Sequence, residues 1–231
     1  MNKKDFVRDM FDAIAPRYDV LNRILSGGID QRWRKRAIRR LSKDRPSRIL
    51  DVATGTADLA ILAATLNPKE IVGVDIAEEM LKIGREKVQK KGLQDLIRLE
   101  AGDAEQLPFS DNEFDAALVA FGVRNFADLD LGLREISRVL RPGAPIIVLE
   151  FSRPRHFPIK QLYKFYGSVI LPNVGRLISG DDAAYTYLPE SIEQFPDGKD
   201  FLDALSRSAF SDAAQERLTF GIASLYSGRA R

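Results

Sequence analysis

The stretch R-I-L-D-V-A-T-G-T-A-D, from Arg48 to Asp58, decides the fold of this chain. Ile49, Leu50 and Val52 are typical of a buried strand, and a turn containing Gly55 follows. The apolar residues after the turn recur at helical spacing. A strand, a glycine turn and a helix in this order build the nucleotide site of doubly wound α/β sheets, because the glycine allows close backbone approach and the helix N-terminus offers unpaired N–H groups.

Acidic residues extend this pattern. Asp51 ends the first strand, and the run I-V-G-V-D-I places Asp75 about 20 residues after the turn, where a ribose-binding carboxylate is expected. The segment E-A-G-D-A adds Asp103 and Ala104 after a third strand. An NAD-dependent oxidoreductase is the weaker alternative, because Gly55 is the only glycine of a turn that would normally read G-x-G-x-x-G. Together the segments resemble the S-adenosylmethionine (SAM) site of class I methyltransferases.

Length and composition limit the possible domain organisation, partners and cofactors. The chain has 231 residues, 45% hydrophobic and 29% charged, which is enough for one domain with a substantial core. A formal net charge of +2 gives no argument for nucleic acid as a partner. The chain has no cysteine and one histidine, so we expect no disulfide and assign no metal ligands.

We expect a cytoplasmic protein with peripheral contact at the inner membrane face. The N-terminus lacks an apolar targeting segment, and no window approaches the roughly 18 apolar residues that span a bilayer. A helix expected over 31–41 carries basic residues that an anionic membrane would attract, by about 1 kcal/mol each. A solvated helix face explains these residues equally well. They are Arg32, Arg34, Lys35, Arg36, Arg39 and Arg40.

The middle of the chain alternates strands and helices. Strands are expected at 48–53, 70–75, 97–101, 114–120 and 144–151, and helices at 56–66, 78–91 and 129–140. Such alternation predicts a mainly parallel sheet that is covered on both faces, with its chemistry at the carboxyl ends of the strands.

The flanking regions differ from this core. Short helices are expected at 5–14 and 21–25, on either side of Pro16. The segment 153–198 is rich in proline and aromatic residues and predicts a substrate lid, helical over 160–171, although some of its aromatic residues would simply pack on the sheet. A helix at 199–210 and an antiparallel pair at 216–220 and 222–226 would end the fold. Residues 1–231 would thus form one domain with a helical cap (1–45), a core (46–152), the lid (153–198) and a terminal helix and strand pair (199–231).

Four motifs resemble the ubiquinone/menaquinone-biosynthesis C-methyltransferases, and the resemblance covers nearly the whole chain. They are Y-D-V-L-N-R-I-L-S-G-G-I-D-Q-R-W (18–33), F-G-V-R-N (121–125), R-V-L-R-P-G-A-P-I-I-V-L-E-F-S (138–152) and A-Y-T-Y-L-P-E-S-I (184–192). The resemblance implies a class I SAM-dependent, Rossmann-like fold, with a mainly parallel seven-stranded sheet whose last strand is antiparallel. It also implies SAM as cofactor.

The implied reaction is methylation of the ring of a prenylated quinol. Conversion of demethylmenaquinol to menaquinol, the last step of menaquinone biosynthesis, is the first choice. Alternatives are the benzoquinol of the ubiquinone pathway, another small molecule, and a SAM-binding scaffold subunit of a quinone-synthesis complex. An amino-adenine methylase is disfavoured, because the chain has no D/N-P-P-Y element after the fourth strand. A homodimer is also expected.

The resemblance implies roles for two groups of residues. Arg124 would stabilise a phenolate, with Asn125 orienting it or the substrate, and Tyr18 with Asp19 would cover the cofactor; a structural Arg-Asn pair and loop packing are the alternatives. In the cofactor site, Gly55 and Thr56 would approach the methionine, Asp75 the ribose and Asp103 the adenine. Asp51 would reach the ammonium through water. The cofactor-binding set is Asp51, Gly55, Thr56, Asp75, Ile76, Asp103, Ala104 and Ala120.

The chain departs from the family pattern at four positions. Ala57 replaces a usual glycine, and its methyl group would lower the SAM affinity unless φ is negative or the cofactor leaves room. Asp30 stands where the family usually has histidine, and we assign it no catalytic role. Ala120 replaces a serine and Ala144 a glycine.

Overall fold

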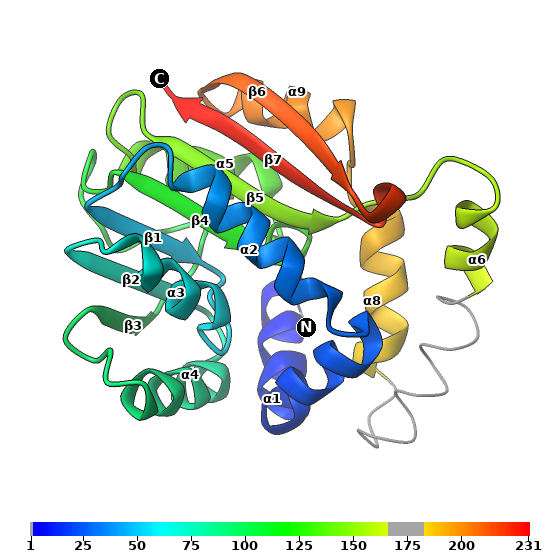
Figure 1. Cartoon of the computed structure of the whole chain (residues 1–231), viewed down its shortest axis with the longest axis horizontal. Helices are drawn as coiled ribbons and strands as arrows, with labels where there is room; N and C mark the ends of the chain where they lie inside the picture. The colour runs from blue at the N-terminus through cyan, green and yellow to red at the C-terminus, as the bar shows by residue number, and fades with distance from the viewer. Residues whose placement is uncertain (1, 166–182) are drawn as a thin grey trace.

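The computed structural model describes residues 2–165 and 183–231, and its centre is a seven-stranded sheet in the order β3-β2-β1-β4-β5-β7-β6 (Figure 1). The strands are β1 (Arg48–Val52), β2 (Glu70–Asp75), β3 (Ile97–Ala101), β4 (Ala116–Ala120), β5 (Pro145–Phe151), β6 (Phe210–Leu218) and β7 (Ala223–Ala230). Strands β1 to β5 pair in parallel, whereas β7 is antiparallel to both β5 and β6. The predicted sheet is therefore confirmed.

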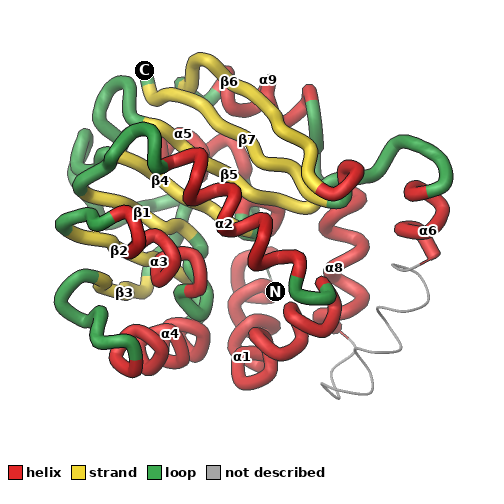
Figure 2. Tube along the Cα trace, viewed as in Figure 1, coloured by secondary structure: helices red, strands yellow, loops and turns green. Residues whose placement is uncertain are grey.

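Helices cover both faces of the sheet (Figure 2). Successive residues of a strand point to opposite faces of the sheet. Ile49 and Leu118 pack with helices α2, α3 and α4 on one face, whereas Leu50 and Val119 pack with α5 and α9 on the other. The helices are α1 (Lys3–Ser26), α2 (Ile29–Leu41), α3 (Asp58–Ala63), α4 (Glu78–Lys90), α5 (Leu129–Val139), α6 (Ile159–Phe165), α8 (Ala183–Gln194) and α9 (Lys199–Arg207). Short 3-10 turns are η1 (Ala64–Leu66), η2 (Val123–Asn125) and η4 (Thr219–Gly221).

Helix α1 is one long helix, so the prediction of two short helices on either side of Pro16 was wrong. It runs without interruption for 24 residues, through Pro16, and Gly27 caps its end at a φ of 57°. Proline removes one backbone donor from a helix interior, but tertiary packing outweighs this cost. Ala15 packs against α4, and Ile14 packs in the cluster that includes Tyr187 of α8. Leu21, which follows the proline, is buried in the same cluster as Ile14. The helix is therefore held on both sides of Pro16.

Several element boundaries also differ from the prediction. Strand β6 begins at Phe210, inside the expected terminal helix. Most residues of β6 are polar and few are buried, so its sequence gives only a weak strand pattern. Strand β7 continues to Ala230, which pairs with Phe210. Strand β4 begins at Ala116, while Phe114 forms only an isolated bridge. Helix α6 ends at Phe165, and the rest of the helix expected over 160–171 falls outside the described residues.

The carboxyl ends of β1, β2, β4 and β5 meet at one edge of the sheet, and α1 and α8 lie beside this edge (Figure 1). Helix α1 packs against both α4 and α8. Among the described helices, none is long and apolar enough to span a membrane.

Candidate active site

Two cavities meet at this edge of the sheet. The larger has a volume of about 630 Å³ and the smaller about 80 Å³. Phe11, Tyr18 and Phe121 line both. Two rings from α1 and one from the end of β4 therefore form a wall that the cavities share.

The smaller cavity gathers most of the residues that the sequence singled out for the cofactor. They come from the ends of β1 to β4, and Asn125 joins them from η2. The predicted residues in its lining are Gly55, Asp75, Ile76, Asp103, Ala104, Ala120 and Asn125, together with Tyr18.

Asp75 is held in place by the turn that follows β1. Its Oδ2 accepts a hydrogen bond from the Gly55 N–H at 2.8 Å, and its Oδ1 accepts one from Ala77 at 2.9 Å. Burial raises the pKa of Asp75, and these backbone donors oppose the shift. Each oxygen keeps further acceptor capacity, so the carboxylate can receive hydroxyl groups from the cavity side.

Asp103 is covered by the first turn of α1. Its Oδ1 accepts a hydrogen bond from the Glu105 N–H at 2.9 Å, and its Oδ2 lies 2.6 Å from Lys4 Nζ. Lys4 Nζ is also 2.9 Å from Glu105 Oε2. The hydrogen bond from Lys4 to Asp103 raises the pKa of Lys4. These ion pairs tie the start of α1 over the smaller cavity, which the sequence pattern did not indicate.

The side chains of Thr56 and Asp51 lie outside the lining of both cavities. Thr56 Oγ1 donates to Asp19 Oδ1 at 2.6 Å and accepts from Lys87 Nζ at 3.1 Å, so it links the turn to α1 and α4. Asp51 is buried and accepts from Thr54 Oγ1 at 2.7 Å. Both side chains therefore stabilise the turn and its neighbours and do not face the cavities.

Ala57 adopts a left-handed conformation with a φ of 64° and is fully buried. A non-glycine residue pays roughly 1–2 kcal/mol for this conformation. Its methyl group faces α4, because a Cβ placed on Gly84 would lie 3.3 Å from it. Ala57 is absent from the lining of the smaller cavity. The methyl group therefore does not occupy the space expected for the cofactor.

Arg124 reaches the larger cavity as half of a buried ion pair. Its Nη1 lies 2.8 Å from Glu150 Oε1, and Glu150 is fully buried at the end of β5. Burial raises the pKa of Glu150, and the Arg124 charge opposes the shift. Arg124 Nε also donates to Ser191 Oγ of α8 at 3.3 Å. The cation expected from the sequence is thus balanced by a carboxylate that the sequence did not indicate.

Asn125 and Tyr187 connect the two cavities. The Tyr187 hydroxyl donates to Asn125 Oδ1 at 3.1 Å, and Asn125 Nδ2 donates to the carbonyl oxygen of Phe121 at 3.4 Å. Asn125 lines the smaller cavity and Tyr187 the larger. Burial raises the pKa of Tyr187, which keeps its hydroxyl protonated and able to donate.

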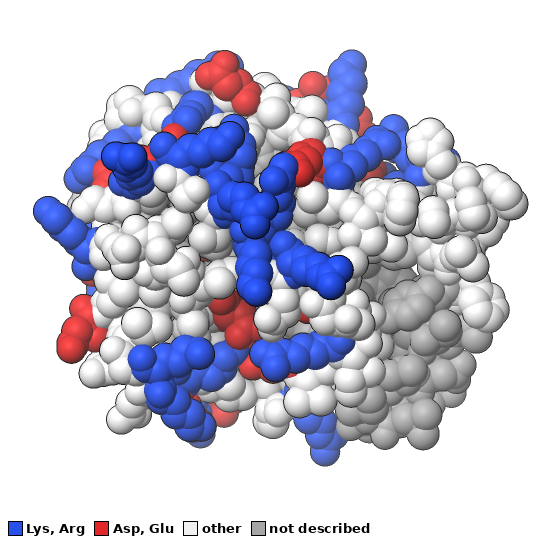
Figure 3. Space-filling view, viewed as in Figure 1, with Lys and Arg blue, Asp and Glu red and all other residues white. Residues whose placement is uncertain are grey.

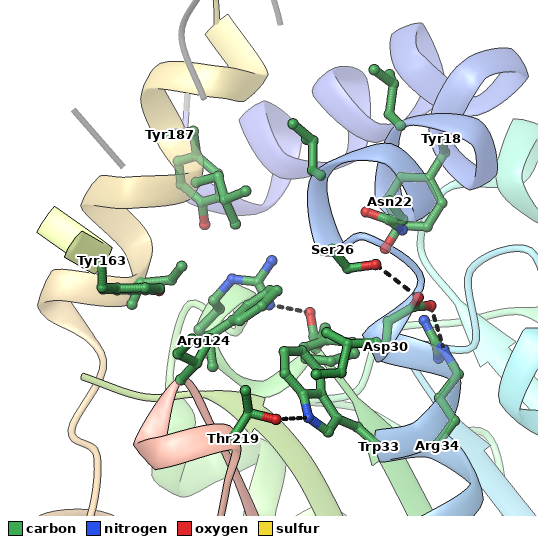
Figure 4. A pocket seen from close by; sticks show the side chains of 18 of the residues that line it. Tyr18, Asn22, Ser26, Asp30, Trp33, Arg34, Arg124, Tyr163, Tyr187 and Thr219 are labelled. Atoms are coloured by element: carbon green, nitrogen blue, oxygen red, sulfur yellow. Dashed lines mark hydrogen bonds and ion pairs between the residues drawn. The ribbon is translucent and has the colours of Figure 1, made fainter. Parts of the chain in front are cut away.

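A second polar group lies in the wall of the larger cavity, at the turn between α1 and α2 (Figure 4). Ser26 Oγ donates to Asp30 Oδ1 at 2.8 Å, and Arg34 Nε lies 3.6 Å from Asp30 Oδ2. Arg34 is buried, so it does not belong to the exposed basic face to which the sequence assigned it. Trp33, beside it, donates from Nε1 to Thr219 Oγ1 at 2.8 Å.

The description "ubiE/COQ5 methyltransferase family" belongs to the family model that matches residues 1–230. The chain belongs to this family. It is 49% identical over 225 residues to demethylmenaquinone methyltransferase of Bacteroides fragilis, covering 97% of this chain and 92% of that protein. It is 44% identical over 228 residues to ubiquinone/menaquinone biosynthesis C-methyltransferase UbiE of Geobacter sulfurreducens, covering 98% and 89%.

Solved structures of low sequence identity share the fold. The [4+2]-cyclase SpnF superposes with a TM-score of 0.71 at 19% identity, over 100% of this chain and 97% of that one. A SAM-dependent methyltransferase from Thermotoga maritima gives 0.64 at 17% identity, over 97% and 99%. Phosphoethanolamine N-methyltransferase 2 of Haemonchus contortus, solved with SAM, gives 0.59 at 14%, over 80% and 48%. These structures confirm the predicted fold class. Membership of the methyltransferase family confirms SAM-dependent methyltransferase activity and SAM as the cofactor.

The burial of Asp51 predicts a pH-dependent stability. Burial raises its pKa from 3.8 to about 7, which Asp75 reinforces and Thr54 and Arg34 oppose. Because the folded state keeps this proton to a higher pH than the unfolded chain, the linked stability is complete below about pH 4 and is lost as pH rises through about 7. Relative to the wild type, Asp51→Asn should gain about 1.4 kcal/mol in free energy of unfolding per pH unit between about pH 5 and pH 7.

Urea unfolding at several pH values measures this difference. Asp203→Asn, at an exposed position of α9, is the control and should keep the wild-type pH dependence. If the free energy of unfolding changes with pH in the same way for Asp51→Asn and the wild type, the prediction is contradicted.

Proposed function

We propose that the protein transfers a methyl group from SAM to a ring carbon of a prenylated quinol, and that demethylmenaquinol is its substrate. The observation that carries this proposal is the shared wall between a small cavity lined by carboxylates and a large apolar one. The larger cavity, with a volume of about 630 Å³, is large enough for a ring with an apolar tail. The relatives named demethylmenaquinone methyltransferase support the naphthoquinol, and those named for ubiquinone as well keep the benzoquinol as the alternative.

The chemistry of the smaller cavity fits SAM. Asp75 would accept the ribose hydroxyls, Asp103 the adenine amine, and the backbone at Gly55 would approach the methionine, while Ile76, Ala104 and Ala120 would lie against the cofactor. Ligand pockets usually measure about 300–1,000 Å³, more than this cavity offers. We therefore propose that the first turn of α1 moves when SAM binds, and that Lys4 leaves its two carboxylates.

Bound SAM supplies the methyl group as a strong electrophile. The protein then has to hold the quinol ring at the shared wall, which contributes through proximity. The Arg124 guanidinium would favour ionisation of a quinol hydroxyl, although Glu150 balances part of its charge. Asn125 and Tyr187 would orient the ring by hydrogen bonds, and Tyr18 would close the wall beside it.

Variants at the two cavities should separate binding from turnover. Asp75→Asn removes the negative charge and should weaken SAM binding by about 10- to 100-fold, since hydrogen bonds to charged groups contribute about 1.5–3 kcal/mol. The double variant Arg124→Met with Glu150→Gln avoids an unpaired buried charge. It should lower kcat at least tenfold and leave the SAM affinity within about threefold.

Calorimetric titration with SAM and steady-state kinetics supply the two readouts, with Asp203→Asn as the surface control. Unchanged SAM affinity in Asp75→Asn would remove the cofactor assignment. An unchanged kcat in the double variant would make the ion pair purely structural.

We also propose that the protein works on a membrane surface, where a prenylated substrate is dissolved. Lys and Arg side chains gather over α2 (Figure 3). Leu162 and Phe165 of α6 line the larger cavity and are also exposed, so apolar surface adjoins that cavity. Other exposed large apolar residues are Val20, Ile24, Phe157 and Phe220. A homodimer and the division into cap, core, lid and terminal hairpin stay predictions.

Binding to vesicles tests the membrane proposal. Neutralising Arg32, Lys35 and Arg39 to Gln should weaken binding to vesicles rich in anionic lipid about 100-fold, because each basic residue contributes about 1 kcal/mol. The matched control neutralises Lys82 and Lys90 of α4 and Lys91, which follows that helix. All three are exposed, and their substitution removes the same amount of charge. Equal losses in both variants, or no vesicle binding by the wild type, would contradict the proposal.

A further inference from the structure

Ser26, Asp30 and Arg34 form a polar group in the wall of the larger cavity. Asp30 and Arg34 lie one turn apart on α2, and all three residues line the larger cavity. Relative exposures of 5% for Asp30 and 8% for Arg34 mean that both charges are withdrawn from water. The cavity around them is otherwise lined mainly by apolar side chains.

Arg34 is incompletely satisfied. Its Nε is buried and has no hydrogen-bond acceptor within the part of the chain that the structure describes. Asp30 Oδ2, at 3.6 Å, is beyond hydrogen-bond distance. A buried ion pair of this quality is weak evidence for a stabilising role, since desolvation of the charges offsets their attraction. The guanidinium also lies 5.4 Å from the centre of the Phe121 ring, which belongs to the shared wall.

The larger cavity therefore has two polar sites, one at Arg124 with Glu150 and one at Asp30 with Arg34. Figure 4 shows Arg124 and Asp30 entering the cavity from different elements, with Trp33 between them in this view. A quinol carries two hydroxyl groups on opposite sides of one ring. A cavity with two separated polar sites in apolar walls matches that distribution of donors.

We propose that Asp30, to which the sequence alone assigned no catalytic role, is a catalytic residue that binds one quinol hydroxyl and takes its proton; this assignment rests on the proposed function. Asp30 accepts the hydroxyl hydrogen bond, and Ser26 and Arg34 hold its carboxylate in place. When the O–H bond breaks, the proton goes to an Asp30 oxygen and the electron pair stays on the quinol oxygen, from which it is delocalised onto the ring carbon. After methylation, the ring carbon loses its own proton to water and Asp30 returns the first proton to the oxygen.

Trp33 provides a direct binding signal, because it is the only tryptophan of the chain and lines the larger cavity. Quenching of its fluorescence by a prenylated naphthoquinol, kept reduced without oxygen, gives the quinol affinity. The oxidised quinone is the matched ligand, because it has the same ring and tail but no hydroxyl donor. The wild type should bind the quinol about tenfold or more tightly than the quinone.

Asp30→Asn keeps an acceptor oxygen but loses the charge and the basicity. It should lower this quinol preference several-fold and kcat by about 100-fold, with quinone affinity and SAM affinity unchanged. Asp30→Glu should restore part of the preference. Ser26→Ala leaves the charge and removes only the hydroxyl that orients Asp30, so it should reduce the preference about threefold even if Asp30→Asn fails to fold.

The outcomes separate this assignment from the proposed function. A wild type that methylates the quinol, with variants that keep both its quinol preference and its kcat, would overturn the role of Asp30 alone. A purely structural role predicts equal losses of quinol and quinone affinity, and that result would also overturn it. A wild type that binds SAM but methylates no quinol would overturn the proposed function itself.

Discussion

The ion pair between Arg124 and Glu150 is the interaction on which the geometry of both cavities depends. A fully buried carboxylate at the end of β5 is tolerated because the guanidinium lies 2.8 Å away. The same guanidinium donates to the carbonyl oxygen of Phe121 and to Ser191. It therefore holds both the ring that divides the cavities and the helix that lines the larger one. Removing one partner would leave an uncompensated charge, at a cost of about 3–5 kcal/mol.

The parts of the structure that depend on local sequence pattern could be predicted from the sequence. Apolar strands alternating with amphipathic helices were sufficient for the parallel sheet, because such strands must be buried on both faces. Asp75 and Asp103 could be placed near each other because the carboxyl ends of parallel strands share one edge. Both line the smaller cavity, and Tyr18 and Asn125 join them there.

Contacts between residues that are distant in the chain could not be predicted from the sequence. Lys4 pairs with Asp103 across 99 positions, and Glu150 lies 26 positions from Arg124, so no local spacing indicates either contact. Arg34 resembles its basic neighbours in sequence, yet the packing of α2 turns it into the cavity wall. The continuity of α1 through Pro16 likewise depends on packing against other helices.

The central claim is that SAM in the smaller cavity meets a prenylated quinol in the larger one. Its most direct test is anaerobic incubation of the protein with methyl-labelled SAM and two reduced substrates, demethylmenaquinol and the benzoquinol of the ubiquinone pathway, followed by mass spectrometry. We predict label on a ring carbon of the naphthoquinol, with less on the benzoquinol. Binding of SAM without label on either prenylated quinol would contradict the account.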